Sequence, residues 1–298
     1  MRIELNDISF SYGRARRRKP AAPPFVLSDI GVTIPTGQML ALAGRSGSGK
    51  STFLQLMKGF IAPSLGSVEL NGTDPHLARR AELFDKVGFI FQYPEHQLFA
   101  NTVFDDIAFG LRAAKLAPDI VETKVRLAME AVRLDYDEFK DRSPFELSGG
   151  EKRRVAIAGV VVLEPGMLIL DEPTAGLDLQ SRRSLFELLH RMNQEQGITV
   201  LWVSHQLDEI LEHAARLIVI HNGRLAADGN PSELLSDSAL LDALGWEEPP
   251  ALAVYRLLRE LGLWDDLRLP TASEAAAIIA RHAHPSDKIL VTTKSELK

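Results

Sequence analysis

A glycine-rich loop at residues 44–52 constrains the fold of this chain more than any other stretch. It comprises Gly44, Arg45, Ser46, Gly47, Ser48, Gly49, Lys50, Ser51 and Thr52, between the apolar run 39–43 and a helical pattern at 52–58. A strand, a glycine loop and a helix in this order favour a cradle in which backbone N–H groups and a helix N-terminus face phosphate. A small-residue turn that merely joins strand to helix is the alternative. The complete match to the motif indicates a nucleoside triphosphate site.

Composition narrows the class of protein. The 298 residues suit one large domain with an appendage, or two domains. The formal net charge is −6, so no general basic field favours nucleic acid as the main partner. The chain has no cysteine, which excludes disulfides and thiolate metal sites and fits a cytosolic location. No apolar segment approaches the roughly 18 residues of a membrane span, and the first residues lack the apolar core of a signal peptide.

Hydrophobic periodicity predicts how the chain is organised. Strands are expected at 2–10, 25–34, 67–71, 86–91, 167–170 and 197–204, with an Asn-Gly hairpin between 217–220 and 225–227. Apolar spacings from about 100 to 163 predict an inserted helical subdomain. Turn residues collect near 236–249, so we expect one domain at 1–236 and a small accessory module at 237–298. In that module helices are expected at 252–263 and 273–282 and a short strand at 288–292, which makes it a small α/β unit without a chemical motif.

Tyr12 and the segment after it each allow two interpretations. Tyr12 ends the first strand and could stack on a nucleotide base or simply pack at the strand end. The following insert, residues 14–24, is basic and rich in proline. It is expected to be an exposed connector, with contact to anionic lipid headgroups as the sharper hypothesis.

Polar residues stand at the ends of several predicted strands. Asp171 and Glu172 end an apolar run, the pattern of a metal-linked aspartate followed by an acid that orients or deprotonates water. Gln92 and His205 also end strands. Parallel sheets bind ligands at the carboxyl ends of their strands, so His205 and the two acids are expected to share one edge with Lys50. Taken singly, such acids are often only solvated, and a lone histidine is more often structural.

Residues 147–151, Leu-Ser-Gly-Gly-Glu, open a second helical pattern. The Ser148 hydroxyl, the N–H groups of Gly149 and Gly150 and the helix dipole suit an anion. Ser148 and Glu151 also have the spacing of a capping box. Both interpretations can hold, because a capped helix end still presents N–H groups outward.

Taken together, these motifs resemble the ATP-binding subunit of ABC transporters over residues 1 to about 235. Tyr12 matches the aromatic loop, 44–52 the phosphate loop and Gln92 the glutamine loop. Residues 147–151 match the signature loop, 168–172 the Walker B strand, Asp178 the D-loop acid and His205 the switch histidine. The resemblance implies a P-loop NTPase fold of the ABC type. In that fold a RecA-like core carries an antiparallel β subdomain and an inserted α-helical subdomain.

Within that superfamily the chain resembles the ATPase of energy-coupling-factor (ECF) importers, which take up vitamins and transition metals. The similar segments are 91–99, 102–103, 106–110, 152–159, 175–178 and 248–252. The family implies a second ATPase subunit, in a homodimer or more typically a heterodimer. It also implies a transmembrane coupling protein, a membrane substrate-binding protein and a place at the cytoplasmic face of the cell membrane. The extended loop after Tyr12 is similar to that of the second ATPase paralogue, while Arg45 and Glu151 are permissible variants.

The resemblance also implies a role for each site residue. Residues 44–52 and Tyr12 would bind ATP, with Lys50 on the β- and γ-phosphates. Mg²⁺ would be held by Ser51, Gln92 and Asp171. Glu172 would polarise the attacking water, with Gln92 sensing metal and water and His205 contacting the γ-phosphate. Ser148, Gly149, Gly150, Glu151 and Asp178 would complete the ATP site of a second subunit.

Two rival functions remain open at the level of sequence. One is the ATPase of a conventional ABC importer or exporter, which the segment 91–110 disfavours. The other is a soluble ABC ATPase that acts on nucleic acid or the ribosome. Such proteins usually carry long coiled coils or tandem ATPase halves, whereas this chain has one phosphate loop and no long heptad run. Residues 97–99 are expected either to contact the membrane coupling protein or to pack at the subdomain junction.

Overall fold

The computed structural model describes residues 1–13, 25–266 and 272–282. The basic insert at 14–24 and the strand expected at 288–292 lie outside these ranges. Two compact units make up the chain, Met1–Pro231 and Ser232–Lys298. The division falls a few residues before the boundary expected at 236.

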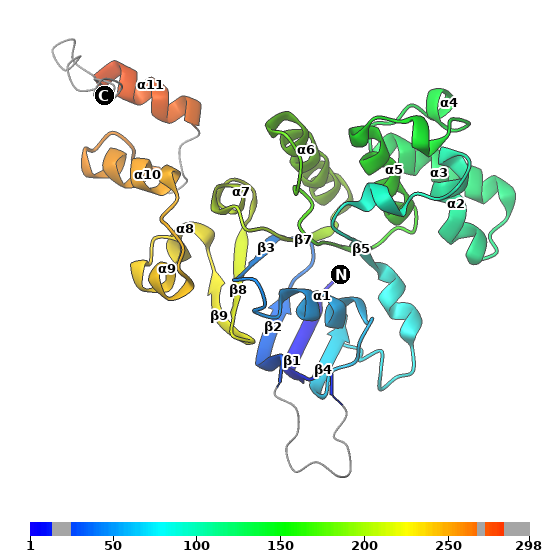
Figure 1. Ribbon diagram of the computed structural model, residues 1–298, viewed down its shortest axis with the longest axis horizontal. Coiled ribbons are helices and arrows are strands. Elements are labelled where there is room, and N and C mark those ends of the chain that lie inside the picture. Colours follow the sequence, from blue (N-terminus) through cyan, green and yellow to red (C-terminus); the bar gives the residue numbers. More distant parts are fainter. Residues whose placement is uncertain (14–24, 267–271, 283–298) are drawn as a thin grey trace, which may run out of the picture. The chain divides into compact units, whose positions relative to one another are not determined.

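A six-stranded sheet forms the centre of the first unit (Figure 1). In spatial order its strands are β5 (Val87–Ile90), β6 (Met167–Leu170), β7 (Thr199–Val203), β3 (Met39–Ala43), β8 (Arg216–His221) and β9 (Arg224–Gly229). All neighbours pair in parallel except β8 and β9, which form the predicted hairpin. Asn222 and Gly223 make its turn with φ of 49° and 74°, the left-handed values that an Asn-Gly turn requires.

A three-stranded antiparallel sheet packs beside it, in the order β2 (Leu27–Ile34), β1 (Ile3–Phe10) and β4 (Leu65–Leu70). Helix α1 (Lys50–Lys58) contributes Phe53 and Leu54 to a core that also holds Ile3 of β1 and Leu40 of β3. The helix that follows the phosphate loop is therefore fixed by apolar contacts with both sheets. This is the α/β arrangement expected from the sequence, with its antiparallel subdomain.

Helices fill the range 103–161, as the apolar spacing predicts. They are α2 (Val103–Ala113), α3 (Pro118–Ala131), the single turn α4 (Tyr136–Phe139) and α5 (Gly149–Val161). Helix α5 contacts α2, α3, strand β5 and a 3₁₀ turn at Pro94–Gln97. The signature segment thus begins a helix that packs on the edge strand of the central sheet.

Two further helices of the first unit follow strands of the sheet. Helix α6 (Leu179–Gln196) comes after β6 and α7 (Leu207–His213) after β7. Phe186 of α6 packs edge-on against Trp202 of β7, with ring centroids 5.4 Å apart. Both helices begin just beyond the strand ends that carry the predicted site residues.

The second unit is helical in its described part. It contains α9 (Ser238–Leu244), α10 (Pro250–Glu260) and α11 (Ala272–His282), and α8 (Pro231–Leu234) lies at the division. Helix α10 starts slightly before the expected residue 252 because Pro250 occupies its first turn, where proline is tolerated. It ends before the expected residue 263, since Gly262 adopts a left-handed φ of 66°. Across the described ranges, no helix has the length and apolar character needed to cross a membrane.

Candidate active site

Four adjacent parallel strands bring the predicted site residues to one edge of the central sheet. In the order β5, β6, β7 and β3, their carboxyl ends lead to Gln92, Asp171 with Glu172, His205, and Gly44. Because parallel strands end at the same edge, residues more than a hundred positions apart become neighbours. The shared edge expected from the sequence is confirmed.

The phosphate loop is folded around its own lysine. Lys50 Nζ donates hydrogen bonds to the carbonyl oxygens of Gly44, at 2.8 Å, and Arg45, at 3.1 Å. The residue is only 8% exposed. Burial lowers the pKa of Lys50, while the charges of Glu172 and Asp171 oppose that lowering. The lysine is thus held at the loop, with two carboxylates close enough to favour its charged form.

Two features of the loop fit a bound phosphate group. Gly44 has φ of 149°, and a Cβ at this position would lie 2.1 Å from the carbonyl oxygen of Ile220, so only glycine allows this close approach. The Ser48 hydroxyl is buried and has no hydrogen-bond partner among the described residues. A buried polar atom without a partner is costly, and an anion in the loop would satisfy it.

Three strand ends converge on the carboxylate of Glu172. Gln92 Nε2 donates to Glu172 Oε2 at 3.0 Å, and His205 Nε2 lies 2.9 Å from Glu172 Oε1. Glu172 has φ of 47°, a strained value for a residue with a side chain. Such strain is typical of functional positions that the surrounding structure enforces. The sheet therefore fixes this acid between an amide and an imidazole.

Asp171 lies next to Glu172 in a partly buried position. Burial raises the pKa of Asp171, as does the charge of Glu172, while Lys50 and His205 act in the opposite direction. A cation beside Asp171 would also favour its ionised form. Its donor oxygens and the Ser51 hydroxyl are of the hard type that suits Mg²⁺.

Tyr12 lies beside the first turn of α1. Its hydroxyl is 3.0 Å from Thr52 Oγ1 and donates to Gln55 Oε1 at 3.3 Å. Its ring packs edge-on against Phe10 and remains 62% exposed. The packing role expected for Tyr12 is present, and an exposed ring face remains for a base.

The signature segment forms a complete capping box at the start of α5. Ser148 Oγ accepts from the N–H of Glu151, and Glu151 Oε2 accepts from the N–H of Ser148 at 2.8 Å. The hydrogen bonds from Ser148 hold the pKa of Glu151 below its usual value. These bonds stay within α5, so the chain by itself does not join Ser148 and Glu151 to the phosphate loop. Gly149 and Gly150 are exposed.

Asp178 caps a second helix in the same way. Its carboxylate accepts from the N–H of Ser181, at 2.8 Å, and from the Ser181 hydroxyl, at 3.0 Å. Asp178 is exposed and begins α6. Like the signature segment, it is presented on a helix N-terminus, whereas the cluster around Glu172 lies at the strand ends.

Glu209 is a buried acid that the sequence did not single out. It accepts from the hydroxyls of Ser204, at 2.9 Å, and Thr174, at 3.2 Å. Ser204 precedes His205 and Thr174 lies two residues after Glu172, so Glu209 joins the segments that carry both. The only available signal was an acid next to the apolar Ile210 in a short helix.

Arg153 is the second missed residue, and it joins three parts of the site. It forms a two-pronged ion pair with Glu95, with Nε–Oε2 of 3.1 Å and Nη2–Oε1 of 3.0 Å, and donates to the Pro173 carbonyl at 2.8 Å. The two side chains are 8% and 18% exposed. Helix α5 is thereby tied to the segment after Gln92 and to the residue after Glu172.

The chain matches a known protein family and has similar relatives. Residues 27–175 match the family model described as ABC transporter. The chain belongs to the ABC transporter family. It is 46% identical over 256 residues to the energy-coupling factor transporter ATP-binding protein EcfA2 of Symbiobacterium thermophilum, covering 85% of this chain and 88% of that protein. The protein of the same name from Clostridium perfringens is 39% identical over 279 residues, covering 92% and 96%.

A solved structure agrees with these relatives. The cbiO1 protein from Clostridium perfringens, part of the ABC transporter complex cbiONQ, superposes with a TM-score of 0.71 at 30% identity. The match covers 87% of this chain and 98% of that one. The ABC-type P-loop fold and the resemblance to ECF transporter ATP-binding proteins are confirmed, and the family is one of ATPases.

Proposed function

We propose that this chain is the ATP-hydrolysing energy-coupling subunit of an ECF-type membrane importer for vitamins or transition-metal ions. The observation that carries the chemistry is the Glu172 carboxylate, held between Gln92 and His205 beside the buried Lys50. The names of the relatives support the ECF class.

In the proposed mechanism each strand-end residue has one task. Lys50 and the N–H groups of the phosphate loop bind the β- and γ-phosphates and stabilise charge on the transferring group. Glu172 orients the attacking water and takes up its proton. His205 contacts the γ-phosphate, and Gln92 positions the water from the other side of Glu172. Tyr12 stacks on the base with its exposed ring.

A divalent cation fits the donor set at this edge. Ser51, Gln92 and Asp171 would hold Mg²⁺ through hydroxyl, amide and carboxylate oxygens, which are hard ligands. When bound, Mg²⁺ neutralises negative charge on the phosphate oxygens. The partial burial of Asp171, which raises its pKa, makes a neighbouring cation favourable.

The second half of each ATP site comes from another ATPase subunit, either a copy of this chain or a paralogue. Ser148, Gly149, Gly150, Glu151 and Asp178 are all offered at the exposed or partly exposed starts of α5 and α6. ATP would join two such subunits, and loss of the γ-phosphate would remove the contacts. Closure and opening of this dimer would drive transport.

The proposal also assigns a role to each domain and a contact with the membrane proteins. Residues 1–236 would form the ATP-binding domain, with helical subdomain 100–163, and 237–298 an accessory module. The protein would sit at the cytoplasmic face of the membrane, held by a transmembrane coupling protein and a membrane substrate-binding protein. The exposed rings of Phe99 and Phe109, 60% and 58% accessible with centroids 5.0 Å apart, support a contact near residues 97–99.

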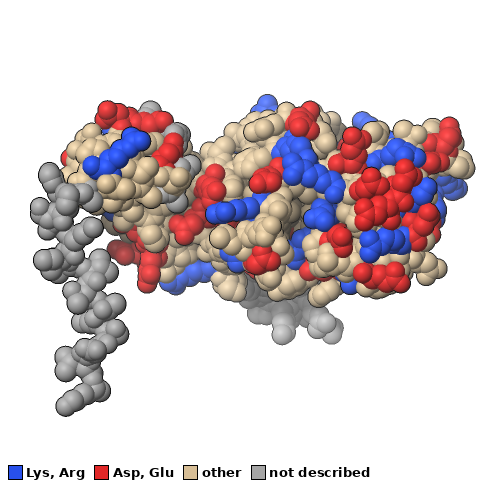
Figure 2. Space-filling model, turned by 90° about the horizontal axis from the view of Figure 1, so that it is seen from above, with Lys and Arg blue, Asp and Glu red and all other residues tan. Residues whose placement is uncertain are grey.

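The net charge of −6 and the charge pattern of one face favour this function over action on nucleic acid. Figure 2 shows Lys and Arg side chains interspersed with Asp and Glu side chains on the face it presents. A nucleic-acid-binding protein is expected to gather its basic residues in one stripe or patch.

The Glu172→Gln variant tests the chemical part of the proposal. We expect ATP hydrolysis to fall at least about a hundredfold, because a base positioned for proton transfer contributes 10²–10⁴-fold. Retained ATP should trap a dimer that gel filtration detects. Glu195→Gln, at an exposed position on the same chain, is the matched control. Wild-type turnover in Glu172→Gln would refute the assignment of the base.

Purification of the native complex tests the transport part. A detergent-soluble complex with small hydrophobic proteins is expected, and its substrate-binding subunit would reveal the cargo. Co-purification with RNA or DNA in place of membrane proteins would instead support the soluble ABC ATPase.

A further inference from the structure

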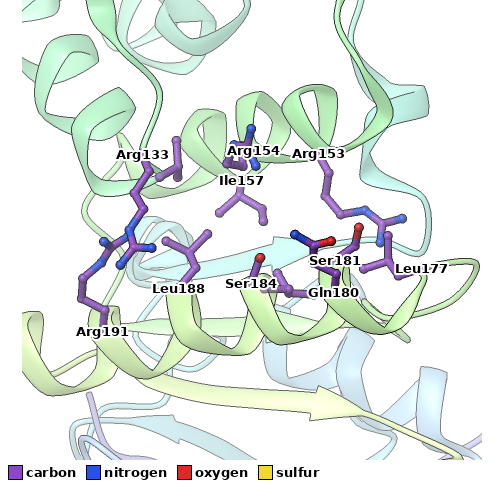
Figure 3. A pocket seen from close by; sticks show the side chains of 13 residues that line it. Arg133, Arg153, Arg154, Ile157, Leu177, Gln180, Ser181, Ser184, Leu188 and Arg191 are labelled. Atoms are coloured by element: carbon purple, nitrogen blue, oxygen red, sulfur yellow. The ribbon is translucent and has the colours of Figure 1, made fainter.

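A cavity of about 410 Å³ lies between helix α5 and helix α6, with Gly150 of the signature segment in its lining (Figure 3). Among the described residues that line it, four are arginines and none is acidic. The apolar side chains of Ile157, Leu185 and Leu188 form part of its wall, and Ser181 and Ser184 contribute hydroxyls. Its size is that of a pocket for a small molecule.

The four arginines differ in how their charge is balanced. Arg153 is paired with Glu95. Among the described residues, the side chain of Arg133 has one long contact with Glu187, at 3.9 Å between exposed side chains, and such pairs contribute little. Arg191 donates to the carbonyl oxygen of Ala131, at 2.9 Å, which carries no full charge. Figure 3 shows Arg133 and Arg191 extending from opposite sides toward the same end of the cavity.

Arg154 is the most informative of the four. Its Nε atom is buried and has no hydrogen-bond partner among the described residues. Its charge contributes to the lowered pKa of Glu151, an acid that is already engaged in the capping box with Ser148. A buried guanidinium donor without an acceptor is costly unless an anion completes it.

From this arrangement we propose that the pocket binds a phosphate group, either free or as the monoester of a small organic molecule. Arg154, Arg133 and Arg191 supply the donors, and the hydroxyl of Ser184 adds to them. The apolar wall accommodates the organic part of an ester. Guanidinium groups suit phosphate oxygens because their N–H donors match them in pairs.

A phosphate group in the pocket would affect the position of the N-terminal ends of α5 and α6. Arg154 lies beside the signature loop, since a Cβ on Gly150 would be 4.0 Å from Arg154 Nη1. The α6 wall begins at Gln180, two residues after Asp178. A phosphate group that bridges α5 and α6 would fix the spacing of the two segments offered to a second subunit. This effect on hydrolysis rests on the proposed function, whereas the binding itself does not.

The binding test uses the full chain loaded with Mg²⁺ and ADP, so that the phosphate loop is occupied. Its thermal midpoint is followed as inorganic phosphate, and separately glycerol 3-phosphate, replaces chloride at constant ionic strength. A ligand that binds only the folded chain raises the midpoint saturably. We expect the apparent Kd for both probes to rise at least about fivefold in Arg154→Gln, which removes a charge-assisted hydrogen-bond donor.

Two further variants make the result decisive. Ser184→Phe fills the cavity and keeps every arginine, so it should weaken the binding of both probes. It serves as a second test if Arg154→Gln folds poorly. Arg183→Gln removes an exposed arginine of the same helix that does not line the pocket, and it should match the wild type. If glycerol 3-phosphate binds more tightly than inorganic phosphate, the ligand is a phosphate ester. If inorganic phosphate binds more tightly, the ligand is free phosphate.

Equal affinities in wild type, Arg154→Gln and Ser184→Phe would overturn the proposal, as would the absence of a saturable shift in the wild type. ATP hydrolysis is measured separately on the same variants. Saturable binding by a chain that shows no ATPase activity even when it is assembled with its second ATPase subunit would leave the pocket established and refute the proposed function instead.

Discussion

The two halves of the proposed ATP site differ in how far one chain completes them. At the strand ends, Lys50 is buried, and the carboxylate of Glu172 contacts the side chains of Gln92 and His205, which follow the two neighbouring strands. At the starts of α5 and α6, Ser148 and Asp178 are exposed, and their side chains form hydrogen bonds to residues of their own helices. One half is preorganised by the sheet, and the other is presented at a surface where a second subunit can use it.

Arg153 provides the physical connection between these halves. It belongs to the signature helix, yet its guanidinium group bonds to Glu95 near Gln92 and to Pro173 beside Glu172. Arg153 therefore ties α5 to the segments that follow Gln92 and Glu172.

The largest expected difference concerns ATP binding by the isolated chain. Lys50→Ala removes the charged donor of the phosphate loop and should weaken ATP binding at least about tenfold, since hydrogen bonds to charged groups contribute about 1.5–3 kcal/mol. Ser148→Arg should leave that affinity unchanged while reducing hydrolysis in the assembled ATPase at least about a hundredfold. Calorimetry on the single chain and turnover in the complex measure the two effects. A loss of single-chain affinity in Ser148→Arg would contradict the division into two halves.

Loss of the Arg153–Glu95 ion pair should lower the free energy of unfolding substantially. Arg153→Met leaves Glu95 partly buried without its partner, so we expect a loss of about 3–5 kcal/mol in the free energy of unfolding. Urea denaturation measures it, with the exposed Arg183→Met as control. The double variant Arg153→Met/Glu95→Met should recover much of the loss, because no uncompensated charge remains. A cost below about 1 kcal/mol in the single variant would show that the pair is not a structural tie.

Acid should destabilise the helices behind the strand ends. His213 of α7 stacks on Phe186 of α6 at 3.9 Å, and its Nδ1 lies 3.3 Å from His190 Nε2. Burial, together with the charge of the nearby His190, lowers the pKa of His213 to about 4. The unfolded chain binds this proton near pH 6.5, so stability is full above that pH and falls as the pH drops toward 4, by up to about 3 kcal/mol.

His213→Phe removes the titrating ring and keeps the stack on Phe186. Its thermal midpoint should therefore depend less on pH between about 6.5 and 4 than that of the wild type. His76→Asn, at an exposed position, is the control. Identical pH profiles for His213→Phe and wild type would contradict the assignment.

The smallest effect is expected at the signature cap. Glu151→Ala removes one side of the capping box and should cost about 0.5–1 kcal/mol of stability. Glu151→Gln keeps an acceptor for the Ser148 N–H and should be close to neutral. Chemical denaturation of the two variants compares them directly, and equal losses would mean that the negative charge, rather than the hydrogen bond, stabilises this end of α5.

The sequence alone determined the elements whose signals are local. Spacing and residue type defined the phosphate loop, the capping box of Ser148 and Glu151 and the Asn222-Gly223 turn, because each depends on a few consecutive residues. It also predicted that Asp171, Glu172 and His205 share an edge with Lys50, since parallel strands place their carboxyl ends together. Family resemblance added the roles of these residues.

Only the tertiary structure decided which residues meet across long separations. Nothing in the run Lys152-Arg153-Arg154 shows that the second residue is buried against Glu95 or that the third faces a cavity. The part played by Glu209 likewise depends on α7 bringing its carboxylate to the hydroxyls of Ser204 and Thr174. Such contacts follow from helix rotation and packing in three dimensions, which single-sequence periodicity fixes only to the level of a face.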